Sequence, residues 1–170
     1  MKKILVVGLI LLLLGCSHVQ IEKNNEIDDN KSSYLAIKKA LDNTEEYTNY
    51  EDLPCNVNFS VNKITDEEIS YRTIIDSPKK DMYKVKALLI HDYFTEDIFP
   101  SIGIFDDTLD LIVDNEEVKG ISLVGYIKTT KQVEELDLKM KLYIQYEDIE
   151  GTVKEVYYKL EQEKEDIGNL

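Results

Sequence analysis

Two histidines limit the acid–base chemistry open to this chain, because a Ser-His-Asp or Cys-His mechanism needs a histidine within hydrogen-bonding distance of the nucleophile. His18 lies in a polar stretch, whereas His91 ends an apolar run and is followed by Asp92. Cys55 is a conceivable partner for His91, but nothing in the sequence brings the two side chains together. A structural role for His91 is therefore favoured, and we predict no catalytic site and no enzyme activity.

Carboxylates are the most abundant reactive groups, with 34 acidic against 20 basic residues and a formal net charge of −14 at pH 7. Paired carboxylates catalyse glycoside hydrolysis, but 34 candidates single out no pair, and the chain has no tryptophan to form a sugar platform. This acidic composition also argues against a nucleic-acid partner, since the phosphate backbone of a nucleic acid binds to rows of basic residues.

The densest acidic segment has the oxygen ligands that calcium prefers, and its members are Asp106, Asp107, Asp110, Asp114, Asn115, Glu116 and Glu117. Their spacing lacks the order of an EF-hand loop. A calcium- or small-ligand-binding β-sandwich module is therefore kept as the alternative function. Zinc is disfavoured because no cluster of cysteine and histidine is present, and neither a metal site nor a cofactor is predicted.

One loop combines apolar side chains with proline and glycine, which interrupt a regular strand. Its apolar residues are Phe99, Ile102, Ile104 and Phe105. If they are exposed, they form a patch suited to a protein partner. The alternative is that the loop folds inward and closes one end of the domain.

Apolar and polar residues alternate with a period of two from Asn56 onward, which is typical of strands with one buried face. The clearest case runs from Leu136 to Tyr146 and turns through residues 147–151 into a second strand, which predicts a hairpin. Strands are expected over residues 56–62, 69–75, 83–90, 109–113, 118–127, 136–146 and 152–160.

Seven short strands separated by turn signals predict a mainly β domain, an immunoglobulin-like β-sandwich with one short N-terminal helix. The helix is predicted over residues 33–47, because Tyr34, Ile37 and Leu41 fall on one helical face. The alternative is an α+β meander sheet packed on this helix.

The chain begins with Met1-Lys2-Lys3 and an apolar run, residues 4–14, that is too short to span a bilayer but fits a secretory signal peptide. The segment Leu13-Leu14-Gly15-Cys16 resembles the lipobox of bacterial lipoproteins, in which the cysteine is diacylated and becomes the mature N-terminus. The resemblance implies a lipid anchor at Cys16, and two acyl chains suffice for stable membrane attachment. An unmodified Cys16 behind an ordinary signal peptide is the alternative.

This interpretation divides the chain into three parts. Residues 1–15 are the lipoprotein signal peptide, residues 16–31 are a lipidated flexible tether with few large apolar residues, and residues 32–170 are a single domain. We expect the protein at the extracytoplasmic face of the cell membrane, where it acts as a non-catalytic binding or structural module for a protein or a cell-envelope component.

Overall fold

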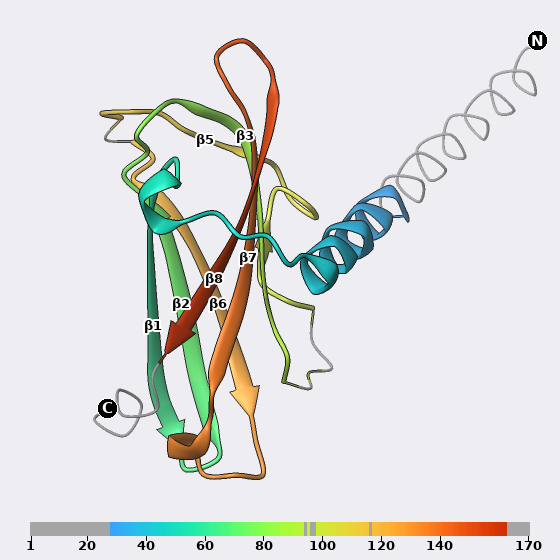
Figure 1. Cartoon of the computed structure of the whole chain (residues 1–170), viewed down its shortest axis with the longest axis vertical. Helices are drawn as coiled ribbons and strands as arrows, with labels where there is room; N and C mark the ends of the chain where they lie inside the picture. Colours follow the sequence, from blue (N-terminus) through green and yellow to red (C-terminus); the bar gives the residue numbers. More distant parts are fainter. Residues whose placement is uncertain (1–27, 94, 96–97, 116, 163–170) are drawn as a thin grey trace, which may run out of the picture.

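The computed structural model describes residues 28–93, 95, 98–115 and 117–162 (Figure 1). The predicted signal peptide, Cys16 and the tether as far as residue 27 lie outside these described residues. The described chain is mainly β, with one N-terminal helix followed by eight strands in two antiparallel sheets, consistent with a sandwich.

The smaller sheet has three strands in the order β1-β2-β6. They are β1 (Asn56–Thr65), β2 (Glu68–Asp76) and β6 (Gly120–Lys128). Burial alternates residue by residue along β6 and along most of β1 and β2, as the period of two predicts. One face of this sheet therefore lies in the core, and the other faces solvent.

The larger sheet has the order β4-β3-β7-β8, with β5 also pairing with β3. Its strands are β3 (Met82–His91), β4 (Ser101–Ile102), β5 (Leu109–Leu111), β7 (Leu138–Glu147) and β8 (Val153–Gln162). Strands β7 and β8 form the predicted hairpin in continuous register.

The main core fills the space between the two sheets. It is built from the inward-facing residues of β1, β2, β3, β6, β7 and β8, including Val61, Ile69, Ile75, Val85, Leu89, Leu123, Ile127, Leu142 and Ile144. Because these side chains come from both sheets, the two layers are held together mainly by the burial of apolar surface.

The N-terminal helix covers residues 28–43 of the described chain, so both predicted ends, 33 and 47, are wrong. Residues 28–31, assigned to the tether from sequence, are helical, because a helix can extend through exposed polar residues by adding backbone hydrogen bonds without burial. After Asn43 the chain extends, and the backbone N–H of Thr48 donates to the Tyr157 carbonyl of β8 at 2.8 Å. The backbone just beyond the predicted helix is thus hydrogen-bonded to the edge of β8.

The helix lies on the outer face of the larger sheet, opposite the main core (Figure 1). Its buried residues Tyr34 and Leu41 pack with Leu88, Ile90 and Tyr143 of β3 and β7 in a second apolar cluster. This arrangement explains why β3 is apolar on both faces, because one face packs in the core between the sheets and the other packs against the helix.

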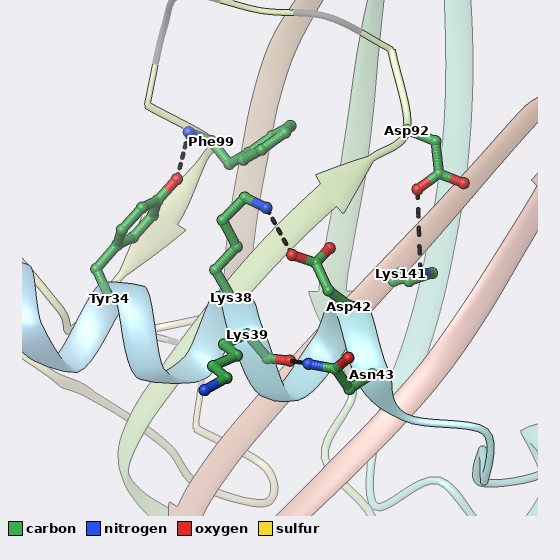
Figure 2. A network of polar contacts seen from close by, with 8 residues as sticks. All are labelled: Tyr34, Lys38, Lys39, Asp42, Asn43, Asp92, Phe99 and Lys141. Atoms are coloured by element: carbon green, nitrogen blue, oxygen red, sulfur yellow. Dashed lines mark hydrogen bonds and ion pairs between the residues drawn. The ribbon is translucent and has the colours of Figure 1, made fainter.

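Polar contacts also connect the helix to the segment before β4 (Figure 2). The backbone N–H of Phe99 donates to the Tyr34 hydroxyl at 3.1 Å, and Lys38 pairs with Asp42 at 2.7 Å while its ammonium lies 5.8 Å from the centre of the Phe99 ring. The segment before β4 is therefore tied to the helix as well as to β3.

Each of the seven predicted strand segments corresponds to an observed strand, and β4 is the strand that the sequence did not predict. It is only two residues long, too short for any period to appear. The alternative of a single meander sheet is not observed, because the strands divide between two sheets. Short 3-10 helices, η1 (Tyr50–Asp52) and η2 (Val133–Glu135), precede β1 and β7.

Candidate binding face

The solvent side of the three-stranded sheet carries a regular polar surface, which we call the nine-residue face. Its members are the outward-facing residues in the middle of β1, β2 and β6: Asn58, Ser60, Asn62, Ser70, Arg72, Ile74, Ser122, Val124 and Tyr126. Strand register places them in three rows, Asn58-Ile74-Ser122, Ser60-Arg72-Val124 and Asn62-Ser70-Tyr126.

Arg72 occupies the centre of this face and is the only arginine of the chain. Its side chain is exposed, and it forms no hydrogen bond or ion pair with any described residue. A guanidinium presents five N–H donors in a fixed fork that matches a carboxylate or a phosphate. The central group of the face is therefore a set of hydrogen-bond donors without a partner among the described residues.

The nine-residue face contains no carboxylate, although acidic residues make up a fifth of the chain. Glu68 and Asp76 stand only at the two ends of β2. Elsewhere, several described lysines pair with carboxylates, as Lys84 does with Glu147 at 2.9 Å. Figure 2 shows another such pair, Lys141 with Asp92 at 4.0 Å. The face thus differs in charge from the surface around it.

A cleft of about 140 Å³ adjoins the face along β6. It is lined mainly by aromatic and aliphatic residues: Tyr71, Thr95, Ile98, Phe99, Pro100, Val124, Gly125 and Tyr126. Gly125 lies opposite Tyr71 in the register of β2 and β6, and a Cβ on Gly125 would overlap the Tyr71 ring. The glycine therefore lets the ring form one wall of the cleft.

No family model matches this chain, and no curated protein or solved structure shows significant similarity to it. None of the helices in the described part of the chain combines the length and apolar composition needed to cross a membrane.

The apolar loop predicted as a partner loop is divided between core and surface. Phe99 and Ile104 are buried in the cluster beneath the helix, and Ile102 is half-buried in β4. Phe105 is exposed, with its ring centre 5.4 Å from that of Tyr34. The four side chains therefore do not form one exposed patch.

His91 and Cys55 are not brought together. Cys55 directly precedes β1, and its thiol is influenced by the charge of Lys79 before β3, whereas His91 ends β3. Ten residues of extended strand span about 30 Å. Burial raises the pKa of the Cys55 thiol to about 12, against the lowering effect of Lys79, so this thiol stays protonated at neutral pH.

The acidic segment uses some of its side-chain oxygens as acceptors for backbone N–H groups. Asp106 accepts the backbone N–H of Gly103 at 2.7 Å, and Asp110 accepts that of Lys84 at 2.8 Å. Across the parts of the chain that the structure describes, no three histidine, cysteine or carboxylate side chains gather closely enough to hold a metal ion. A shallow cleft of about 520 Å³ borders Asp114 and Asn115, together with Ser77 and Lys119.

The nine-residue face was not identified from the sequence. The alternating asparagine and serine residues of β1 indicated only a solvated side of a strand. The signal that was available is the single arginine in a chain so rich in acid. Its central position depends on the pairing of β2 with β6, two strands separated in sequence by β3, β4 and β5.

Proposed function

We propose that the chain is a non-catalytic, lipid-anchored protein of the extracytoplasmic side of a cell membrane, whose nine-residue face binds another protein or a cell-envelope component. The observation that carries the proposal is this carboxylate-free face on a strongly acidic chain, centred on Arg72, which has no partner among the described residues. The lipobox resemblance at Cys16 supports the anchor.

The position of the helix supports the same assignment. The helix covers the outer side of the larger sheet, and the nine-residue face lies on the opposite side of the molecule (Figure 1). Residues 17–27 connect Cys16 to the described start of the helix, so the anchor joins the domain from the helix side. This arrangement favours presentation of the nine-residue face away from the bilayer.

The composition of the face is suited to binding. Tyrosine and arginine are enriched where proteins bind one another, and charged residues are depleted at the centre of such interfaces. Serine and asparagine supply adaptable hydrogen bonds at little conformational cost. Tyr126, Val124 and Ile74 add apolar surface beside the polar groups, and Tyr126 keeps 57% of its surface exposed.

We further propose an immunoglobulin-like topology for the domain. In such domains strands A, B and E share one sheet while C, F and G share the other. The order β1-β2-β6 corresponds to A-B-E, and the order β3-β7-β8 corresponds to C-F-G. Strand β4 then lies beside β3, as C′ lies beside C in variable-type domains.

Site-specific photo-crosslinking in intact cells tests the binding function. A photoreactive amino acid replaces Ser60 on the nine-residue face or, as a matched control, the exposed Ala36 on the helix side. We expect a discrete adduct from position 60 that position 36 does not give. Adding Ser122→Trp, which places a bulky ring on the same face, should abolish it.

The proposal fails if positions 60 and 36 give the same adducts, or if the position-60 adduct persists with Ser122→Trp. Far-UV circular dichroism and urea unfolding of each variant establish that the fold is retained. An exposed serine replaced at the centre of a sheet face should change the free energy of unfolding by no more than about 0.5 kcal/mol.

A further inference from the structure

We infer that the partner is a polypeptide segment that presents one carboxylate to Arg72 and places a neighbouring apolar side chain in the cleft beside β6. This inference rests on the proposed function and names the chemistry of what the nine-residue face recognises. Two adjacent features carry it, an exposed guanidinium without a described partner and a cleft of the right size.

The surroundings of Arg72 favour a negatively charged ligand group. Arg72 is surrounded in the sheet by Ser60, Val124, Ser70 and Ile74, none of which carries a charge. A carboxylate that approaches Arg72 therefore meets no opposing carboxylate on the nine-residue face. Hydrogen bonds between ions of opposite charge are about twice as strong as those between neutral groups, and the guanidinium fork makes them bidentate.

The cleft beside β6 has the size and position to hold one apolar side chain. A volume of about 140 Å³ matches one aromatic ring or branched aliphatic side chain, since a cavity of about 150 Å³ holds benzene. Val124 lines the cleft and is also the register partner of Arg72, so the two features are neighbours across one strand spacing of about 4.8 Å. Side chains one or two residues apart in an extended segment cover that separation.

The composition of the nine-residue face favours a polypeptide over a polyanion. A phosphate polymer selects rows of lysine and arginine, whereas the nine-residue face offers a single cation among hydroxyl, amide and apolar groups. Lys128 stands at the end of β6 opposite Glu68, outside this face. One carboxylate beside an apolar residue fits this arrangement, and a string of phosphates does not.

The test is a selection from a displayed library of random peptides on the purified protein, followed by NMR. Because Arg72 is the only arginine, ¹⁵N-arginine labelling gives a single side-chain Nε–H signal that reports directly on this group. We expect selected peptides to share an aspartate or glutamate within two residues of an aromatic or branched aliphatic residue. They should shift the Arg72 Nε–H signal, and inorganic polyphosphate should not.

Matched substitutions isolate each part of the inference. Arg72→Gln should weaken peptide binding by about ten- to a hundredfold, as expected for loss of a charge-assisted contact. Lys128→Gln removes a cation from the neighbouring strand β6 and should change binding less than about threefold, because an exposed charge at the margin contributes little. Replacing the peptide's acidic residue by its amide, or its apolar residue by alanine, should also weaken binding.

The outcomes distinguish this inference from the proposed function. If Arg72→Gln binds the selected peptides as well as the wild type does, while Ser122→Trp does not, the carboxylate inference is wrong and the binding face stands. If Ser122→Trp also binds fully, the face itself is wrong. Selection of no peptide, or an Arg72-dependent response to polyphosphate alone, overturns the polypeptide inference.

Discussion

At the scale of single residues, His91 shows how an ionisable side chain can serve as packing. Its ring meets Tyr71 and Phe99 edge-on, with centres 5.4 and 4.9 Å apart, and neither ring nitrogen forms a hydrogen bond in the described structure. Burial lowers the pKa of His91, while the backbone of Tyr93 and the carboxylate of Asp92 act in the opposite direction. The neutral ring therefore belongs to the aromatic cluster behind the cleft.

This burial makes the stability contribution of His91 depend on pH. The unfolded chain has the ordinary pKa of 6.5, so below about pH 6.5 it binds the proton more readily than the folded chain does. Stability is fully present above that pH and is lost as the pH falls toward the folded pKa, by at most about 1.4 kcal/mol per pH unit. His91→Leu should lack this component.

Urea unfolding of the wild type and His91→Leu at pH 7.5, 6.5 and 5.5 measures the effect. The carboxylates are identical in both proteins, so most of their contribution cancels in the difference. We expect the free energy of unfolding of the wild type to fall relative to that of the variant as the pH decreases. A constant difference across this range would contradict the assignment.

At the scale of elements, the helix is held to the larger sheet by a few buried side chains. Leu41 has no exposed surface and lies in the cluster with Leu88, Ile90 and Tyr143, whereas Leu35 on the same helix is 52% exposed. The outward side of β3 would otherwise present apolar residues to water. Helix and sheet are therefore expected to unfold as one unit.

Leu41→Ala and Leu35→Ala compare the two sides of the helix with the same chemical change. Leu41→Ala should lower the free energy of unfolding by about 2–5 kcal/mol, the usual cost of a cavity in a packed cluster. Leu35→Ala should change it by less than about 0.5 kcal/mol. Denaturant unfolding provides both values, and equal losses would mean that the helix does not pack as described.

At the scale of the whole molecule, the sandwich separates two surfaces. One side carries the helix through which the proposed anchor joins the domain, and the other carries the nine-residue face. A net charge of −14 should hold the domain off an anionic bilayer surface. In the proposed function, the anchor would set the location of the protein, and the carboxylate-free face would set what the domain binds.

The two cysteines allow a direct test of the anchor. Cells fed a labelled fatty acid should incorporate it into the wild type and into Cys55→Ala, but not into Cys16→Ala. The reason is that diacylation is expected at Cys16 alone, while the thiol of Cys55 is buried. Incorporation into Cys16→Ala, or none into the wild type, would remove the basis for the lipid anchor.

The sequence alone was sufficient for seven of the eight strands, all except the two-residue β4, because a period of two is a local property of neighbouring residues. The β7–β8 hairpin could be predicted for that reason. The C-terminal end of the helix could not, because the chain that follows it is held by a hydrogen bond from Thr48 to the distant Tyr157 of β8. The burial of Phe99 and Ile104 could not be predicted either, since the helix that covers them is distant in the sequence.

The candidate site depended on tertiary structure almost entirely. The sequence contains one arginine and alternating polar residues, but it does not say which strands lie side by side. Pairing of β2 with both β1 and β6 placed Ser60, Arg72 and Val124 in one row and left Arg72 at the centre of a face without carboxylates. Register between strands distant in sequence is set by burial of their opposite faces in a shared core. A local sequence pattern therefore does not predict which strands pair.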